Sequence, residues 1–456
     1  MVQSDTQRRS LHGQWSSRLT FILALSGSAV GLGNIWKFPY IAGVNGGGAF
    51  VLVYLVCVFV IGLPIMMSEI LIGRRGRRNP IDTMRLLGEE EGGTKRWRVV
   101  GFLGVIASFL ILSYYSVVAG WAVAYIFEGA SGIFVDTDAV GVGEIFEELT
   151  GSWVTSGLWH TLFMVMTVFV VARGVKQGLE RAVRILMPAL IGLLLLLLGY
   201  SMIEGNFAEG VAFMFAPKFD ELTSEGVLAA LGHAFFTLSI GMGAVMAYGA
   251  YLPEETSIVA TSFAVICIDT SIAILAGLVI FPIVFAYGLD PAEGPGLIFH
   301  SLPIAFGQLP GGTVIATVFF LLLTFAAWTS GIALMESPVA WLMESRGMGR
   351  PITAILIGTI IWAMGFLSIL SFSALADFEF GWGTFFDNLD FLTSNIMLPL
   401  GGFAIAIFAG WIMCANSTSD ELSMGVGRRY GMWRWFTRFV APVAVMLVFL
   451  NAIGVI

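Results

Sequence analysis

The sequence predicts an all-α polytopic membrane protein with eleven transmembrane helices, and three observations lead to this fold class. Of the 456 residues, 57% are hydrophobic and only 12% are charged, whereas soluble domains carry about 25% charged residues. The apolar residues form uninterrupted stretches of about twenty, the length of helix that spans a bilayer. Strands of a membrane β-barrel would instead show as alternating segments of about ten residues.

The composition also excludes other classes of protein. The net charge of −8 has the wrong sign for a nucleic-acid partner, and the long apolar runs are incompatible with a disordered chain. Cys57, Cys267 and Cys414 all lie in apolar stretches and are expected to be reduced core thiols. The polar start of the chain runs directly into a full-length span, so we expect no signal peptide.

The apolar stretches place the eleven expected spans in chain order. Their ranges are 18–42, 48–72, 99–127, 157–173, 182–203, 226–251, 258–287, 313–343, 351–371, 391–415 and 435–455. Basic residues concentrate in alternate loops, such as the arginine-rich segment 74–98, whereas the segment 128–159 is acidic and contains no Lys or Arg. The positive-inside rule therefore predicts a cytoplasmic N-terminus and, with eleven spans, an extracellular C-terminus.

Two of the expected spans are interrupted by glycine at mid-membrane. The first contains Gly27, Gly31 and Gly33, and the sixth contains Gly241 and Gly243. Each glycine costs about 1 kcal/mol relative to alanine inside a helix, and unwound backbone is tolerated at this depth only where it is buried in protein or lines a cavity. Close packing of small residues between helices is the alternative. Interruptions in spans one and six imply a five-plus-five repeat and point to a transporter binding site.

The expected organisation follows from this repeat. It comprises a cytoplasmic N-terminal segment at 1–17, a first inverted repeat with helices 1–5 at 18–203, an extracellular loop at 204–225, a second inverted repeat with helices 6–10 at 226–415, a cytoplasmic loop at 416–434 and helix 11 at 435–456.

A long string at the first interruption carries a family resemblance. It reads Gly31-Leu-Gly-Asn34-Ile-Trp-Lys37-Phe-Pro39-Tyr and is followed by Asn45-Gly-Gly-Gly-Ala-Phe50. Further strings of the same kind are Tyr114-Tyr115, Phe235-Phe-Thr237-Leu-Ser239 and Trp328-Thr329-Ser330. From about Trp15 to its end, the chain closely resembles the neurotransmitter:sodium symporter family, and within it the eleven-span bacterial amino-acid transporters. The resemblance implies a LeuT-type inverted repeat with broken helices one and six, sodium-driven alternating access and a place in the cell membrane of a prokaryote.

The resemblance implies sodium ions as cofactors, at two sites. Sodium prefers oxygen ligands, and unwound helices supply carbonyl groups that have no hydrogen-bond partner. The positions matching the first site are the carbonyl of Ala29 and the side chains of Asn34, Thr237 and Asp269. Those matching the second site are the carbonyls of Gly27, Val30 and Ala326 and the hydroxyls of Thr329 and Ser330. The alternative for both hydroxyls is a hydrogen bond back to the preceding helical turn.

Asp269 and His233 depart from the family's pattern. Asp269 stands where many relatives carry Asn, near the site at which chloride-dependent members bind Cl⁻. A carboxylate inside the membrane is costly unless it is paired; we expect Na⁺ to pair with it and the carboxylate to replace chloride, which would make transport chloride-independent. His233 stands where those relatives carry Gln. It is either a neutral, hydrogen-bonded core histidine or a group that makes uptake pH-sensitive.

The resemblance also outlines a pocket for an amino acid. The substrate carboxylate would meet the sodium ion, the amides near Leu32 and Gly33, and the Tyr115 hydroxyl, since the N-terminus of a half-helix favours an anion. The full expected set is Ala29, Leu32, Gly33, Ile111, Tyr115, Phe236, Thr237, Ser239, Met242, Gly243, Ser330 and Leu334. No acid or base faces the substrate side chain, so we expect an apolar one. Met242 would leave room for a large or aromatic group, or is ordinary core filler.

Gate residues follow from the same resemblance. The outer gate is expected to consist of Lys37 and Asp390, with Tyr115 and Phe236 forming a hydrophobic lid. The inner gate is expected to consist of His12, Trp15, Tyr251 and Glu344. His12 stands where the family carries an arginine, and Arg8 and Arg9 are the alternatives for the missing cation. Two further acidic residues within the spans, Glu69 and Glu336, are expected to make structural hydrogen bonds.

The sequence therefore predicts a sodium-coupled secondary symporter that imports hydrophobic or aromatic L-amino acids by alternating access. Its expected partners are a small amino-acid substrate and the lipid bilayer. The alternatives are a sodium-coupled transporter of another small zwitterion, such as a compatible solute, and a transport-inactive sensor with the same pocket. An enzyme is not expected, because the sequence contains no Walker A string, metal-ligand cluster or nucleophile elbow.

Overall fold

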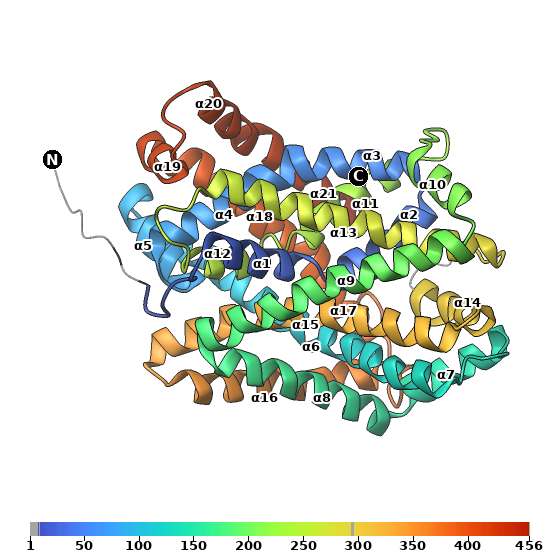
Figure 1. Cartoon of the computed structure of the whole chain (residues 1–456). Coiled ribbons are helices and arrows are strands. Elements are labelled where there is room, and N and C mark those ends of the chain that lie inside the picture. The colour runs from blue at the N-terminus through green and yellow to red at the C-terminus, as the bar shows by residue number, and fades with distance from the viewer. Residues whose placement is uncertain (1–7, 9, 293–295, 456) are drawn as a thin grey trace.

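The computed structural model describes Arg8, residues 10–292 and residues 296–455, and within this part the chain is a bundle of helices. The long helices run side by side, and short helices lie at the two ends of the bundle, with α5, α19 and α20 at one end and α7, α10 and α14 at the other (Figure 1). The predicted all-α membrane fold is confirmed: in the described residues, nine helical segments are long and apolar enough to cross a bilayer.

The helix bounds of the first half follow the predicted spans closely. They are α1 (Arg18–Ala29), η1 (Gly33–Lys37), α2 (Phe38–Val44), α3 (Gly48–Cys57), η2 (Val58–Gly62), α4 (Leu63–Gly76), α5 (Pro80–Gly92), η3 (Lys95–Trp97), α6 (Arg98–Ser131), α7 (Ala139–Gly151), α8 (Trp153–Ala172), η4 (Val175–Glu180), α9 (Arg181–Glu204) and α10 (Phe207–Phe215). The segments η1, η2 and η4 are π-helical turns that continue into α-helix.

The second half begins with the other interrupted span. Its helices are α11 (Ser224–Thr237), α12 (Ala244–Gly249), α13 (Ile258–Ala286), η5 (Leu297–Ser301), α14 (Leu302–Gln308), α15 (Gly312–Arg346), α16 (Arg350–Leu370), α17 (Phe385–Asp390), η6 (Phe391–Met397), α18 (Leu398–Ile407), η7 (Phe408–Ile412), α19 (Ala415–Leu422), α20 (Arg428–Trp435), η8 (Phe436–Val440) and α21 (Ala441–Ala452).

Both predicted interruptions are present. The segment Arg18–Ala29 is bent by 53° against Gly33–Val44, and this bent pair is a tenth candidate span. Six residues separate α11 from α12, and three of them have a positive φ: Ser239 at 54°, Gly241 at 82° and Gly243 at 77°. Glycine adopts this conformation at no steric cost. Because α11 and α12 are individually too short to span, the count of eleven helices stays a prediction.

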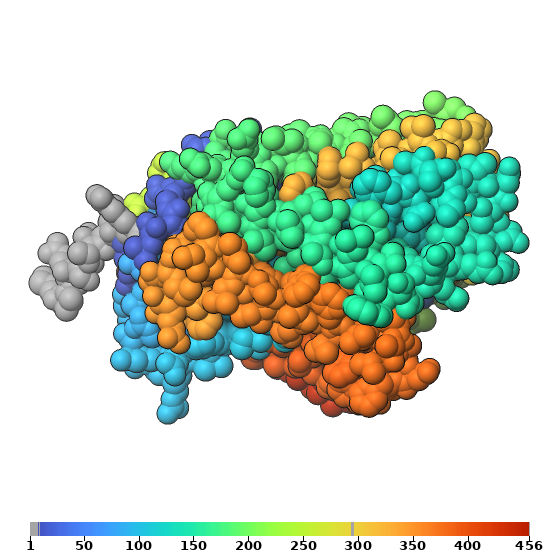
Figure 2. All heavy atoms as spheres, turned by 90° about the horizontal axis from the view of Figure 1, so that it is seen from below, coloured from blue at the N-terminus to red at the C-terminus, as the bar shows by residue number. Residues whose placement is uncertain are grey.

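The most buried spans are α6 and α15, which pack against each other at the middle of the bundle. The periphery consists of α8, α9, α16 and α21, which carry exposed apolar side chains such as Val165, Leu195 and Ile355. Figure 2 views the molecule from the side on which α8 and α16 lie. Such an apolar periphery suits contact with lipid rather than water.

The three cysteines are free, as expected, but they are not all in the core. Cys57 is buried and Cys267 is intermediate, whereas Cys414 is exposed. Cys414 is the N-cap of α19 and accepts a hydrogen bond from the Ser417 amide. The expectation of a core thiol is therefore wrong for Cys414, because the apolar stretch ends where this cap turns the chain into a polar helix.

Candidate functional site

The two helix breaks lie against each other inside the bundle and are joined by serine side chains. The Ser239 hydroxyl, in the α11–α12 break, donates to the Ser28 carbonyl of α1 at 2.9 Å. The Ser330 hydroxyl of α15 lies 3.2 Å from the same carbonyl. All three serines are buried. The breaks and α15 therefore form a single centre.

A small cavity lies between the breaks. It is lined by Ser28, Ala29, Gly31, Leu32, Gly33, Ile111, Tyr115, Phe236, Thr237, Ser239, Met242, Ser330 and Leu334. The sequence predicts all of these as substrate-binding residues except Ser28 and Gly31. The predicted residue Gly243 does not line the cavity, because its backbone packs on Gly104 of α6.

The backbone at Gly31 comes so close to its neighbours that a side chain would not fit. A Cβ atom there would lie 2.5 Å from Ser330 Oγ and 2.9 Å from the Tyr115 hydroxyl oxygen. The next amide, that of Leu32, donates to the Tyr115 hydroxyl at 3.3 Å. The glycine string thus brings backbone amides and hydroxyls to one wall of the cavity, where they can serve as donors to a carboxylate.

Three of the residues predicted for the first sodium site form one cluster beside the cavity. Asn34 Nδ2 donates to Asp269 Oδ1 at 2.8 Å, and the Thr237 hydroxyl donates to the same oxygen at 3.2 Å. Asn34 and Asp269 are fully buried, and Thr237 nearly so. The fourth residue, Ala29, lines the adjoining cavity. In the described residues no basic side chain lies within 4.0 Å of Asp269. A buried carboxylate with oxygen-bearing neighbours fits a hard cation.

The residues predicted for the second sodium site also lie together, between α1 and α15. Ser330 Oγ lies 3.3 Å from the Gly27 carbonyl and 3.2 Å from the Val30 carbonyl. The Thr329 hydroxyl donates to the Ala326 carbonyl at 3.0 Å, which is the back-bonded arrangement considered as an alternative. The structure therefore gathers five oxygen-bearing groups in one place, the donor set that a hard cation needs.

The predicted outer-gate pair is not in direct contact. Lys37 Nζ lies 4.4 Å from the centre of the Phe236 ring, a cation–π contact. The Asp390 carboxylate accepts hydrogen bonds from the Tyr114 hydroxyl at 3.1 Å and from the Ser394 hydroxyl at 2.8 Å. Within the described residues, Lys37 and Asp390 form no ion pair within 4.0 Å. In this conformation the lysine therefore touches the lid residue Phe236 rather than its predicted acidic partner.

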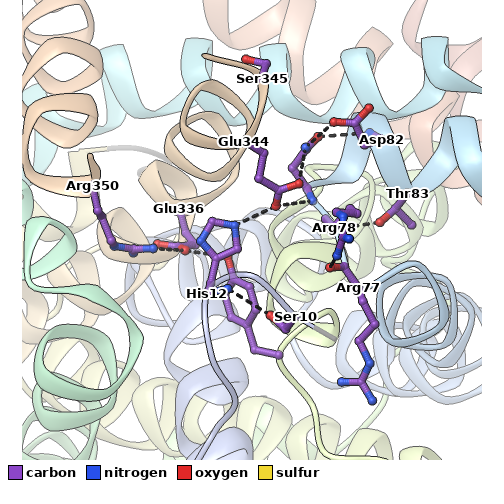
Figure 3. A network of polar contacts seen from close by, with 12 residues as sticks. Ser10, His12, Arg77, Arg78, Asp82, Thr83, Glu336, Glu344, Ser345 and Arg350 are labelled. Carbon is purple, nitrogen blue, oxygen red and sulfur yellow. Dashed lines mark hydrogen bonds and ion pairs between the residues drawn. The ribbon is translucent and has the colours of Figure 1, made fainter. Parts of the chain in front are cut away.

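The predicted inner-gate residues do meet, and Figure 3 shows the contact between His12 and Glu344. His12 Nε2 lies 2.7 Å from Glu344 Oε1, and both side chains are almost completely buried. The Trp15 amide donates to the Tyr251 carbonyl at 3.1 Å. Arg8 bonds instead to Glu90, and Arg9 lies outside the described residues. His12, the expected replacement for the missing arginine, therefore contacts Glu344, and the segment before α1 is bonded to α15 and to the end of α12.

A second pair beside the inner gate involves a residue that sequence reasoning missed. Glu336 is fully buried and accepts hydrogen bonds from the Tyr251 hydroxyl at 2.8 Å and from Arg350 Nη1 at 3.0 Å. Figure 3 shows Arg350 reaching Glu336 from the start of α16. Glu336 therefore makes the structural bonds expected for it. Arg350 stands directly before the expected span at 351–371, close to Arg346, and no local motif in the sequence marks it as the partner of Glu336.

Two further polar residues of the spans, Glu69 and His233, are buried. Glu69 accepts a hydrogen bond from the Gly241 amide at 3.0 Å and so holds the α11–α12 break, a structural bond of the expected kind. His233 is buried, and neither of its ring nitrogens has a hydrogen-bond partner among the described residues. His233 therefore lies in the core, packed on Phe38 and Tyr54, but without the hydrogen bond expected of a core histidine. That His233 makes uptake pH-sensitive stays a prediction.

The His12→Ala variant is expected to raise hydrogen–deuterium exchange of the first amides of α1 by about tenfold or more. A hydrogen bond to a charged group contributes about 1.5–3 kcal/mol, and its loss lowers the free energy of local opening by that amount. The measurement is exchange of peptides covering residues 15–25. His300→Ala, which changes a histidine of η5 at the other end of the bundle, is the control; equal exchange in the two variants would contradict a gating role for His12.

The sequence and fold were compared with known proteins. A family model described as the Sodium:neurotransmitter symporter family matches residues 12–134 and 143–456. The sodium-dependent transporter YhdH of Bacillus subtilis is 38% identical over 446 residues, which cover 97% of this chain and 98% of that protein. A sodium-dependent transporter of Haemophilus influenzae is 32% identical over 458 residues, which cover 99% of this chain and 99% of that protein.

A solved structure is similar over almost the whole bundle. The crystal structure of MhsT in complex with L-phenylalanine has 43% sequence identity to this chain and a TM-score of 0.89. The similarity covers 96% of this chain and 99% of that chain.

Proposed function

Because the chain belongs to the sodium:neurotransmitter symporter family, we propose that it imports hydrophobic or aromatic L-amino acids together with sodium and without chloride. The family membership makes it a sodium-dependent symporter in a membrane and not an enzyme. The substrate class is our inference. It rests chiefly on one observation: among the described residues, none that lines the cavity at the helix breaks is acidic or basic.

The cavity divides into a polar and an apolar part. Backbone amides near Leu32 and the Tyr115 hydroxyl lie on one side, where they would hold the carboxylate of an amino acid. Ile111, Met242 and Leu334 also line the cavity and would surround its side chain. A buried charge on the substrate side chain would find no partner there. The complex of MhsT with L-phenylalanine supports a hydrophobic amino acid.

We assign the Asp269 cluster to one sodium ion and the group between α1 and α15 to a second. The first cluster adjoins the cavity wall, so the substrate carboxylate and the ion would attract each other. The ion would also neutralise the buried Asp269 carboxylate, which is why no chloride is needed to balance the charge. Sodium and substrate then favour each other's binding by the same factor, and this coupling allows a sodium gradient to drive uptake.

We also propose the orientation and the division of the chain. The end that carries α5 and the His12–Glu344 contact is assigned to the cytoplasm, because arginines concentrate there. The gate of Lys37, Phe236, Tyr115 and Asp390 then faces outward. With α11–α12 as the sixth span, residues 18–203 and 226–415 form the two five-helix repeats, and the C-terminus lies outside the cell.

The proposed function is tested by uptake into proteoliposomes. We expect accumulation of radiolabelled L-phenylalanine with an inward sodium gradient and none with choline, and equal uptake when gluconate replaces chloride. A competition panel of the twenty amino acids should place aromatic and large aliphatic ones first. Preferential competition by a compatible solute would favour the zwitterion alternative, and binding without accumulation would favour a sensor; either result contradicts the proposal.

The Met242→Phe variant is expected to raise the KM for phenylalanine relative to that for alanine by about tenfold. Met242 lines the cavity and is almost fully buried, so a rigid ring would take space that the flexible thioether can yield. A misfit of this size costs about 1–3 kcal/mol. The measurement is competitive uptake, with the exposed Met432→Phe as control; an unchanged ratio of KM values would show that Met242 is only core filler.

A further inference from the structure

An apolar groove lies between α8 and α16, on the periphery of the bundle. Met164, Val165 and Val168 form one side, and Ile355, Gly358 and Trp362 form the other. Its volume of about 610 Å³ lies within the range of ligand sites, about 300–1,000 Å³. Figure 2 is drawn from the side on which these two helices lie. None of these residues belongs to the transport site described above.

Hydrogen bonds fix both ends of the groove. The Trp362 indole donates to the Thr161 hydroxyl at 2.8 Å at one end, and Arg350 Nε donates to the Val171 carbonyl at 2.8 Å at the other. Between them, a Cβ atom at Gly358 would lie 2.3 Å from Val168 Cγ2, so the two walls are in close contact at this point. Contacts between α8 and α16 therefore fix the relative position of the two walls.

The groove faces the surroundings rather than the protein. Val165 is 59% exposed and Ile355 is 57% exposed. Both α8 and α16 are candidate membrane spans, so these side chains lie at the depth of the acyl chains. A groove with such walls would hold hydrocarbon in the membrane.

The end of the groove at which α8 stops carries an unneutralised cation. Arg173 is exposed, lines the groove and lies with its guanidinium carbon 3.9 Å from the centre of the Phe169 ring. In the described part of the chain it has no acidic partner within 4.0 Å. The neighbouring Arg350 is already paired with Glu336. A negative group arriving at this end would therefore find Arg173 unpaired by any described carboxylate.

We propose that this groove is a binding site for an anionic phospholipid. One acyl chain lies between α8 and α16, and the headgroup phosphate accepts hydrogen bonds from the Arg173 guanidinium. A guanidinium binds phosphate through two parallel hydrogen bonds, and each Lys or Arg near the surface adds about 1 kcal/mol to anionic lipid binding. Charge complementarity at the mouth thus favours an anionic lipid over a neutral one. The proposal does not depend on which substrate is transported.

The test uses the full-length protein purified in detergent and measures bound lipid by native mass spectrometry. Dioleoylphosphatidylglycerol and dioleoylphosphatidylcholine, which share acyl chains, are the two probes. We expect the wild type to retain phosphatidylglycerol preferentially, and Arg173→Gln to reduce this preference by about fivefold. Val165→Trp, which fills the groove, should reduce retention of both lipids.

The controls are Arg428→Gln, an exposed arginine at the start of α20, and Val443→Trp, an exposed valine on α21. Both should bind the two lipids as the wild type does. Equal retention of the two lipids by the wild type, or unchanged retention in both groove variants, would overturn the proposal. A third result would also overturn the proposal: a dimeric wild type, with Val165→Trp monomeric and its lipid retention unchanged. This face would then be an interface between two copies of the chain.

Discussion

The Asp269→Asn variant is expected to bind sodium about 30-fold more weakly, or worse, and to lose sodium-driven uptake in chloride-free medium. The Asp269 carboxylate is fully buried and has no basic partner within 4.0 Å among the described residues, so a bound cation would supply its counter-charge. Removing one partner of a buried charge pair costs about 2–5 kcal/mol, and each 1.4 kcal/mol is a factor of ten in affinity. The measurement is uptake as a function of sodium concentration with gluconate as the anion.

Chloride provides the internal check on this prediction. If the Asp269 carboxylate supplies the negative charge that chloride would otherwise supply, adding chloride at fixed sodium should restore some uptake to Asp269→Asn. Uptake by the wild type should not change. Asp220→Asn, at an exposed position, is the matched control and should behave as the wild type. Wild-type sodium affinity in Asp269→Asn would exclude the carboxylate as a ligand. A chloride requirement in the wild type would exclude it as a replacement for the anion.

The Glu336→Gln variant is expected to lose about 3–5 kcal/mol of stability, the typical cost of leaving one partner of a buried ion pair alone. Glu336 is fully buried, and it accepts from both Arg350 and Tyr251. Glutamine keeps the shape but removes the charge that compensates Arg350. Denaturant unfolding of the detergent-solubilised protein, followed by tryptophan fluorescence, measures the loss.

A double variant distinguishes the stability contributed by the ion pair from the contributions of its two side chains. Replacing both residues, Glu336→Met with Arg350→Met, removes the uncompensated charge and should cost less than the sum of the two single changes. Glu147→Gln, on the exposed surface of α7, is the control for a simple change of net charge. If Glu336→Gln unfolds at the same denaturant concentration as Glu147→Gln, the pair does not stabilise this end of the bundle.

The features predicted best from the sequence are those set by the backbone. Glycines at 31, 241 and 243 mark positions where a side chain would clash or where φ is positive, and the structure has its breaks there. The lining residues of the cavity could be predicted because the two breaks, which the glycines mark in the sequence, bring the ends of α1 and α11 against α15. Fold class and cavity therefore followed from local chemistry and the family resemblance.

The features predicted less well depend on side-chain rotamers and on polar helix ends. Lys37 contacts Phe236 rather than Asp390, a choice made by a flexible side chain. The helical segment expected at 391–415 begins earlier, at Phe385, because Thr384 and Asp387 form a capping box ahead of the apolar run. The last helical segment begins at Arg428, in a polar stretch that a hydropathy pattern passes over. Arg350 pairs with a residue 14 positions away across a turn between helices, which no short motif encodes.

The carbonyl of Ser28 lies within hydrogen-bond distance of two hydroxyls, 2.9 Å from Ser239 Oγ in the α11–α12 break and 3.2 Å from Ser330 Oγ on α15. A tilt of α1 away from this point would break both bonds in the same movement. Two hydrogen bonds are together worth about 1–3 kcal/mol, which lowers the population of a slipped conformation by roughly 5- to 150-fold. We expect this shared acceptor to favour the conformation in which α1, the α11–α12 break and α15 pack together, and so to limit leakage of ions through the unloaded protein.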